Sequence, residues 1–180
     1  MADSHFPNAR LRCFVACWPD ETTRYRLDRI AQDVVGRTPG ARRVRAENLH
    51  LTLAFIGELP QPKARESADA VRDLAVEPFD WRIDHTGRFE RAHVLWAGGP
   101  PEPRLEQLAE RVRSQLRALQ IRFETKQFAA HVTLLRDLPS RPPAGPVDAI
   151  EPFVWPVRSA VLLVSTRDAQ GATCYRPLER

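Results

Sequence analysis

The segments His50-Leu51-Thr52-Leu53 and His131-Val132-Thr133-Leu134 repeat one pattern, histidine, apolar residue, threonine, leucine, 81 residues apart. In a β-strand, successive side chains alternate between the two faces. If both copies are strands, each therefore places its histidine and threonine on one face and its two apolar side chains on the other. One face is then available for chemistry while the other packs in the core. A single His-x-Thr is weak evidence, but two copies in similar contexts indicate a shared function.

The residues before the two copies predict the same kinds of element in each half of the chain. Before the first copy, we expect a strand at 10–18, a helix at 21–37 that Asp20 caps, and a short strand at 42–45. Before the second copy, we expect strands at 79–90 and 94–98, a helix at 103–120 and a strand at 121–124. The motif strands themselves end at Gly57 and at Leu138. The halves therefore mirror each other.

The remaining segments complete an α+β fold. A helix is expected at 62–76, a Pro-rich surface loop at 140–146, and strands at 153–166 and 173–178. Apolar residues Tyr25, Leu27, Ile30 and Val34 predict the buried face of the first helix. Strands with little strict β-α-β alternation favour antiparallel sheets. With 180 residues and 43% hydrophobic content, we expect residues 1–180 to form a single domain of two pseudo-symmetric lobes, each with one motif.

Composition limits the class of protein. A net charge of +4 favours anionic partners such as RNA or nucleotides. No apolar stretch is long enough to cross a bilayer and no signal peptide is evident, so we expect a cytoplasmic protein. The three cysteines, Cys13, Cys17 and Cys174, form no Cys-x-x-Cys motif, and we expect reduced, packed thiols rather than a zinc or redox site.

The paired histidines suit acid–base chemistry at phosphorus. Imidazole titrates near neutrality, so one ring can accept a proton while the other donates one. In-line substitution at phosphorus needs these two groups on opposite sides of the reacting atom. Thr52 and Thr133 can donate hydrogen bonds to the non-bridging oxygens, and no metal is required. The other histidines, His5, His85 and His93, lack such a companion, and we assign them no role.

Longer segments around the two copies resemble a known family. Residues 47–58, ENLHLTLAFIGE, and 130–136, AHVTLLR, resemble the two signature segments of the RNA 2′,3′-cyclic phosphodiesterases in the two-histidine phosphoesterase superfamily, whose bacterial members are also called 2′-5′ RNA ligases. The likeness extends to residues 14–16, 94–98 and 175–180. It implies a bilobal α+β fold, with two antiparallel sheets related by a pseudo-two-fold around a central cleft and helices outside.

The resemblance also assigns roles to residues. It implies that His50 is the proton donor to the 3′ oxygen and His131 the proton acceptor that activates water, with Thr52 and Thr133 beside them. It makes Arg136 a phosphate-binding residue, although strict alternation from His131 places Arg136 on the opposite face. Either a bulge in the strand or the position of Arg136 at the strand end must reconcile the two. The matching position in the first motif is Phe55, which either stacks on a nucleobase or packs in the core; we favour the core.

The leading prediction is hydrolysis of an RNA terminal 2′,3′-cyclic phosphate to a 2′-phosphomonoester, without metal or other cofactor. The alternatives are 2′-5′ RNA ligation and a nucleotide- or RNA-binding module without significant turnover. The expected partner is RNA or a nucleotide with a 2′,3′-cyclic phosphate end, and we expect a monomer with no membrane contact and no obligate protein partner. Arg42, Arg43 and Arg45 either form a rim that follows the RNA backbone or belong to a solvated basic strand.

Overall fold

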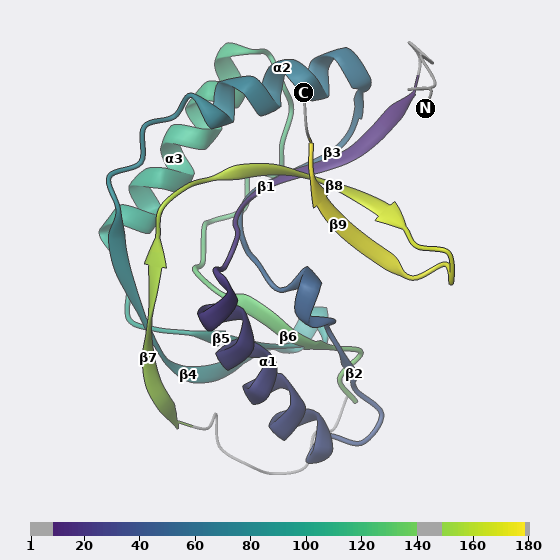
Figure 1. Ribbon diagram of the computed structural model, residues 1–180, viewed down its shortest axis with the longest axis vertical. Coiled ribbons are helices and arrows are strands. Elements are labelled where there is room, and N and C mark those ends of the chain that lie inside the picture. The colour runs from purple at the N-terminus through teal and green to yellow at the C-terminus, as the bar shows by residue number, and fades with distance from the viewer. Residues whose placement is uncertain (1–8, 140–148, 179–180) are drawn as a thin grey trace.

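A computed structural model describes residues 9–139 and 149–178, and these residues form an α+β protein (Figure 1). The elements in chain order are β1 (Arg10–Cys17), α1 (Glu21–Gly36), β2 (Arg42–Arg43), the 3-10 turn η1 (Ala46–Asn48), β3 (Leu51–Pro60), α2 (Gln61–Arg72), β4 (Phe79–Phe89), the 3-10 turn η2 (Glu90–Ala92), β5 (Val94–Gly98), α3 (Pro103–Ala118), β6 (Val132–Arg136), β7 (Ala149–Val157), β8 (Val161–Arg167) and β9 (Thr173–Pro177). The loop expected at 140–146 and His5 lie outside the described residues.

The strands among the described residues form one sheet, in the order β7-β4-β5-β6-β3-β1-β8-β9 with β2 beside β6. All their pairings are antiparallel. The prediction of two separate sheets was wrong, because the motif strands β3 and β6 pair at the centre through Leu51 and Val132. These are the first residues of the two strands. Because the two strands are antiparallel and both begin at this pair, they continue in opposite directions from it. The pair of Leu51 and Val132 therefore links the two halves of the sheet.

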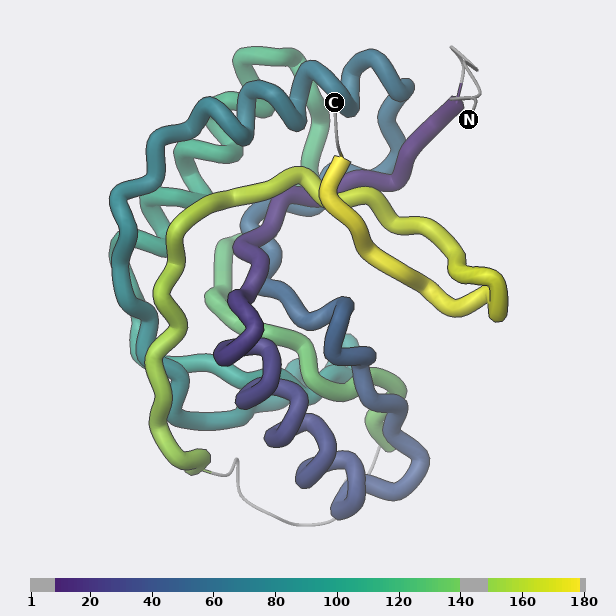
Figure 2. Tube along the Cα trace, in the orientation of Figure 1, coloured from purple at the N-terminus to yellow at the C-terminus, as the bar shows by residue number. Residues whose placement is uncertain are grey.

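Helices α1 and α3 each pack against the half of the sheet that does not contain the motif strand following them in the chain. Helix α1 precedes β3 but packs against β6, β7 and β2, whereas α3 follows β5 and packs against β3. Helix α2 packs against α3, β1 and β8. Figures 1 and 2 show α2 and α3 together at one end of the molecule and α1 at the other. Helix α1, which precedes β3 in the chain, therefore covers the half of the sheet that contains β6, and α3, which precedes β6, covers the half that contains β3.

Helix α1 begins as the sequence predicts, since the Asp20 side chain accepts a hydrogen bond from Thr23 N–H at 2.7 Å. The prediction that Tyr25 belongs to its buried face was wrong, because Tyr25 is 65% exposed. Two residues advance a helix by about 200°, so Tyr25 and Leu27 point in nearly opposite directions. The buried residues of the helix are Thr23, Leu27, Ala31 and Val34.

Three strand predictions were also inaccurate. Residues 121–124 form no strand; Glu124 N–H donates one bond of 2.8 Å to the Phe55 carbonyl. Residues 153–166 are not one strand, because β7 pairs with β4 and β8 pairs with β1, and the chain crosses between the two halves of the sheet after Val157 (Figure 1). Gly57 does not end β3, since its φ of +90° lies in a bulge through which the strand continues to Pro60.

The apolar faces of the strands pack against the helices to form the main core. Cys13 and Cys17 of β1 belong to it, and both are almost completely buried. Burial raises the pKa of the Cys13 thiol to about 11 and that of Cys17 to about 12. Both are therefore packed, unreactive thiols, as the sequence predicts.

Gly87 permits a close packing contact between β4 and β5. It pairs with Trp96 across β4 and β5, and a Cβ atom built on Gly87 lies 2.1 Å from a carbon of the Trp96 indole. The substitution Gly87→Ala must displace this indole, so we expect it to lower the free energy of unfolding by about 1–3 kcal/mol. Denaturant unfolding measures this loss.

The matched control is Gly36→Ala at the end of α1, where no atom lies within 4 Å of the added Cβ. We expect this variant to be as stable as the unchanged protein or more stable by up to about 1 kcal/mol. Equal unfolding midpoints for Gly87→Ala and the unchanged protein would contradict the packing argument.

Candidate active site

The two motif histidines occupy matching local environments. Each directly precedes its central strand, and each ring nitrogen Nδ1 lies 2.7 Å from the carbonyl oxygen two residues earlier, that of Asn48 for His50 and that of Ala129 for His131. A carbonyl oxygen only accepts hydrogen bonds, so Nδ1 carries the proton in both rings. The other nitrogen, Nε2, is therefore the one that can exchange a proton in either ring.

The structure brings the six predicted site residues to one cleft of about 440 Å³. Its lining includes His50, Thr52, Phe55, His131, Thr133 and Arg136. The hydroxyl oxygen of Thr52 lies 3.1 Å from Nε2 of His50. Aromatic and polar side chains that the motif did not indicate also line the cleft, including Phe89, Phe128, Lys126 and Gln127. The cleft can therefore contact both an anion and a flat ring.

A bulge in β6 places Arg136 in the cleft. Thr133 pairs with Trp96 while Leu135 pairs with Leu95, so Leu134 is one residue in excess over β5. Leu134 and Leu135 are both buried, and the alternation of side chains is shifted by one residue after them. Arg136 consequently returns to the face of His131. Of the two explanations that the resemblance left open for Arg136, the structure therefore shows the bulge.

A second bulge stands at the same place in β3. Thr52 pairs with Ala16 and Ala54 with Val15, which leaves Leu53 in excess. Phe55 therefore faces the cleft side, and our preference for the core was only partly correct. Phe55 is partly buried beside a small apolar cluster on that face, and the Arg12 guanidinium lies 5.2 Å from its ring centroid. Its ring can pack and still contact a ligand.

Aromatic side chains surround both histidine rings. The His50 ring centroid lies 4.8 Å from that of Phe14 and 5.2 Å from that of Tyr175. The His131 ring centroid lies 4.8 Å from that of Phe89 and 6.4 Å from that of Trp96. These four residues could not be assigned to the site from the sequence, because they come from four other strands and only alternation within each strand indicates the face on which they lie.

Burial and one nearby cation set the protonation of the histidines. The pKa of His50 is lowered to about 4, mainly by burial; the Asn48 carbonyl raises it, and the positive charges of Arg136 and His131 contribute to lowering it. Burial and Arg136 also lower the pKa of His131, against the effect of the Ala129 carbonyl. Both rings are therefore neutral at pH 7, beside a guanidinium that acts on both. An anion bound there would offset this charge and favour protonation.

A second cavity of about 580 Å³ adjoins the cleft and shares His50, Thr133 and Arg136 with it. Three arginines before the first motif, Arg42, Arg43 and Arg45, line this cavity. Each is paired with a carboxylate: Arg42 with Asp137 at 2.9 Å, Arg43 with Asp28, and Arg45 with Asp168 at 2.5 Å. These ion pairs offset the positive charge of the arginines, which favours the solvated basic strand over a rim that follows RNA.

His85 and His93, which have no predicted role, lie outside the cleft lining. His85 Nδ1 lies 2.8 Å from an Asp84 carboxylate oxygen, and His93 Nδ1 lies 3.0 Å from the Leu138 carbonyl oxygen. Over residues 9–139 and 149–178, the structure contains no group of three His, Cys, Asp or Glu side chains that could hold a metal ion. No helix in these same two ranges is long and apolar enough to span a membrane.

Known proteins resemble the chain in both sequence and structure. Residues 18–96 match the family described as LigT like Phosphoesterase. The RNA 2′,3′-cyclic phosphodiesterase of Escherichia coli K12 is 35% identical over 144 residues, which cover 77% of this chain and 78% of that relative. The protein of the same name from Archaeoglobus fulgidus is 32% identical over 129 residues, 70% of this chain and 72% of the relative.

Solved structures agree with this relationship over nearly the whole chain. The crystal structure of a phosphoesterase superposes with a TM-score of 0.80 at 30% identity, over 96% of this chain and 97% of that chain. E. coli LigT complexed with 3′-AMP superposes with a TM-score of 0.79 at 29% identity and the same coverage. The level of identity and the extent of both matches establish the relationship, and the chain belongs to the LigT-like phosphoesterase family.

Proposed function

We propose that this protein hydrolyses the terminal 2′,3′-cyclic phosphate of RNA to a 2′-phosphomonoester. The observation that carries the proposal is that two histidines of the same tautomer share one cleft with a guanidinium that influences both. This combination suits acid–base chemistry at an anionic phosphorus centre, because it supplies two proton-transfer groups and a positive charge. The names of the relatives, RNA 2′,3′-cyclic phosphodiesterase, support the same reaction.

In the proposed reaction, Nε2 of His131 accepts a proton from water as the water oxygen attacks phosphorus. The bond between phosphorus and the 3′ oxygen breaks on the opposite side, and the departing oxygen receives the proton of Nε2 of His50. The product carries its phosphate on the 2′ oxygen. His131 ends charged with the proton from water, and His50 ends neutral because its proton is on the 3′ oxygen. Both rings present Nε2 for this purpose because Nδ1 is bonded to a carbonyl.

The proton donor has to be charged before the reaction, although burial keeps the unliganded His50 neutral at pH 7. A bound phosphodiester contributes one negative charge beside Arg136, and this charge raises the pKa of both histidines. Substrate binding is therefore coupled to proton uptake in the cleft. His131 remains neutral as the base, and the charged ring is the one that donates.

The other cleft residues stabilise the charge and hold the nucleoside. Thr52 and Thr133 donate their hydroxyl hydrogens to non-bridging oxygens, and Arg136 binds the phosphate through its planar guanidinium. Phe55 stacks on the base of the terminal nucleotide. Since Arg136 supplies the positive charge and the histidines move the protons, the proposed mechanism uses no metal or other cofactor.

The chain as a whole is proposed to be one domain with two lobes related by a pseudo-two-fold axis. The segment β1-α1-β3 corresponds to β5-α3-β6, since in each a helix separates an inner strand from the motif strand beside it in the sheet. The exchange of α1 and α3 between the two halves fits such an axis. One chain contributes both histidines, so a monomer acting on cytoplasmic RNA, without a membrane or a protein partner, suffices for the reaction.

The deciding experiment is product analysis with an oligonucleotide that ends in a 2′,3′-cyclic phosphate, alone and with a 5′-hydroxyl oligonucleotide. We expect the product to be a 2′-phosphomonoester, and we expect EDTA to leave the rate of its formation unchanged. Because each histidine moves one proton in the transition state, His50→Ala and His131→Ala should each lower kcat by roughly 10²-fold or more. Steady-state kinetics on folded protein, checked by circular dichroism, measures the loss.

His93→Asn is the control, since His93 lies outside the cleft lining and asparagine tolerates its positive φ of 50°. This variant should keep the activity of the unchanged protein. A joined product with a 2′-5′ linkage would indicate ligation, and tight binding without turnover would indicate a binding module. Loss of activity in EDTA would overturn the metal-free mechanism.

The pH dependence tests the role of Arg136. Because the pKa of each histidine lies below 6.5 in the unliganded protein, kcat/KM should be bell-shaped, with a maximum below pH 6.5. Arg136→Gln removes the positive charge that lowers both pKa values, so the whole bell should move to higher pH. The same substitution should lower kcat/KM by roughly tenfold or more through loss of the phosphate contact.

The matched variant Arg136→Lys keeps the charge but loses the planar guanidinium. Its kcat/KM should fall while its pH optimum stays close to that of the unchanged protein. The measurement is kcat/KM between pH 4 and pH 8 with a nucleoside 2′,3′-cyclic phosphate. An Arg136→Gln profile that keeps the original optimum would show that this guanidinium does not control the histidines.

A further inference from the structure

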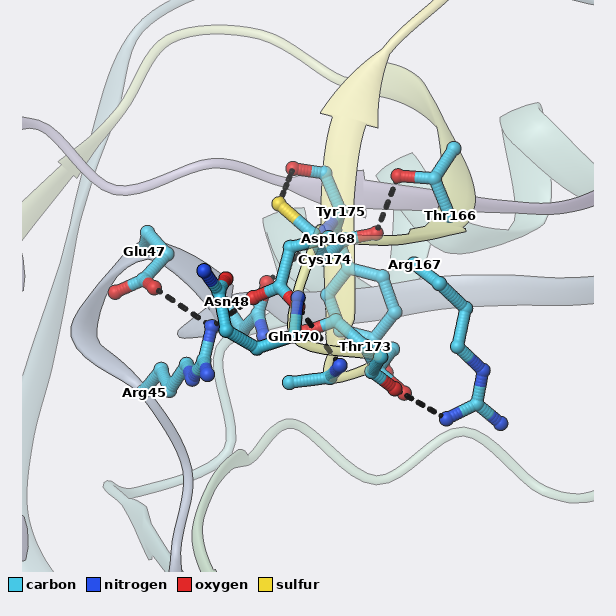
Figure 3. A network of polar contacts seen from close by, with 12 residues as sticks. Arg45, Glu47, Asn48, Thr166, Arg167, Asp168, Gln170, Thr173, Cys174 and Tyr175 are labelled. Carbon is cyan, nitrogen blue, oxygen red and sulfur yellow. Dashed lines mark hydrogen bonds and ion pairs between the residues drawn. The ribbon is translucent and has the colours of Figure 1, made fainter.

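Asn48 joins the first motif to a distant strand. It is the last residue of η1, two residues before His50, and it is only 6% exposed. Its amide Nδ2 donates to the Thr173 carbonyl oxygen at 2.8 Å, and its Oδ1 accepts from Tyr175 N–H at 3.0 Å (Figure 3). Since a backbone carbonyl only accepts and a backbone N–H only donates, the orientation of this amide is determined. Asn48 therefore binds β9 by two bonds of fixed direction.

The backbone of Asn48 is held as firmly as its side chain. Its N–H donates to the Arg45 carbonyl oxygen at 2.9 Å, which closes the turn of η1. Its own carbonyl oxygen is the acceptor for Nδ1 of His50 at 2.7 Å. All four polar groups of Asn48 are thus engaged, and its carbonyl cannot turn away from His50 without breaking the bonds to β9.

The hairpin of β8 and β9 is itself anchored beside the motif. Asp168, in the turn between the two strands, pairs with Arg45 and accepts bonds from Gln170 N–H at 3.0 Å and Ala172 N–H at 2.8 Å (Figure 3). Tyr175, whose backbone N–H binds Asn48, also packs its ring perpendicular to the His50 ring, with the ring centroids 5.2 Å apart. The hairpin therefore contacts His50 directly through Tyr175 and indirectly through Asn48.

The second histidine has no such connection among the described residues. The carbonyl that accepts from His131 belongs to Ala129, in the irregular segment between α3 and β6, and an alanine side chain can form no hydrogen bond. The two rings have the same local geometry but different support. A change that loosens the contact between Asn48 and β9 should therefore affect His50 alone.

We propose that Asn48 is a positioning residue: its amide bonds to β9 fix the carbonyl that holds His50 in one tautomer, with Nε2 directed into the cleft. The proposal rests on the hydrolysis proposed above, for which it identifies the residue that prepares the proton donor. Asn48 acts through His50. It is absent from the lining of the cleft that holds both histidines, and in the adjoining cavity, which it does line, its side chain is bonded to β9. The consequence of its loss should therefore appear in kcat and leave KM nearly unchanged.

Two variants test the proposal. Asn48→Ala removes both bonds to β9, and Asn48→Asp keeps the size and the acceptor for Tyr175 N–H but loses the donor to Thr173. We expect kcat to fall roughly 10- to 100-fold in each, as for other groups that orient a functional imidazole, with KM within about twofold. In protein labelled with ¹⁵N-histidine, the Nδ1–H of His50 should exchange with water at least about tenfold faster, while that of His131 stays unchanged.

The control for a purely structural effect is Ser67→Ala in α2. Ser67 is fully buried, and its hydroxyl donates a hydrogen bond of 2.8 Å to the Lys63 carbonyl oxygen. Neither residue lines the cleft. This variant also loses a buried hydrogen bond, so its unfolding midpoint should fall, but its kcat and both histidine signals should remain those of the unchanged protein.

Wild-type kcat in folded Asn48→Ala and Asn48→Asp would overturn the proposal, and so would an unchanged exchange rate at His50. The NMR measurement needs no substrate and remains valid if one of the two variants does not fold. It also separates the two proposals: absence of hydrolysis by the unchanged protein would reject the function, whereas the exchange rates would still decide whether Asn48 positions His50.

Discussion

The pairing of Leu51 with Val132 is the contact on which the geometry of the site depends. Both side chains are fully buried, and each directly follows a motif histidine. Because neighbouring residues of a strand face opposite ways, burying this pair turns His50, Thr52, His131 and Thr133 to the other face together. Antiparallel register then sets His50 across from Thr133 and Thr52 across from His131. A shift of one residue in this register would bury the histidines and expose the leucine and valine, so the hydrophobic core itself protects the arrangement of the polar groups.

The same placement determines the electrostatics. A ring that lies at the centre of a sheet, against Phe14 and Tyr175 or against Phe89 and Trp96, has lost most of its water, and its neutral form is favoured. Arg136 adds a fixed positive charge that acts on both rings. The unliganded site therefore contains two neutral histidines beside a positive guanidinium, and an anion such as a phosphodiester can balance this positive charge. Under the proposed function, the substrate creates the protonation state in which it reacts.

Features encoded by neighbouring residues could be predicted from the sequence, and features that join distant segments could not. The helices at 21–36 and 103–118 follow from apolar periodicity and from the Asp20 cap, and the motif strands follow from alternation. The bulge before Arg136 was one of two explanations that could be anticipated, because the role implied by the resemblance conflicted with the face that alternation gives Arg136. No such conflict marked Phe55, since an aromatic residue suits either face, and its cleft position was underestimated. The single sheet, the aromatic residues around the histidines and the bonds of Asn48 to β9 connect residues up to 127 positions apart, and no local pattern records such contacts.

The two bulges give a nearly symmetric site its direction. In each motif strand the residue directly after the threonine is in excess, and this returns the fifth residue after the histidine to the cleft. On one side that residue is Arg136 and on the other it is Phe55. A cation opposite an aromatic ring distinguishes the two ends of a nucleotide, because the phosphate is attracted to the guanidinium and the base to the ring. Once a nucleotide binds in one orientation, the two histidines face different oxygens of its phosphate. Under the proposed function, the two rings can then take different roles, and the fifth residue contributes to the chemical asymmetry that acid–base catalysis requires.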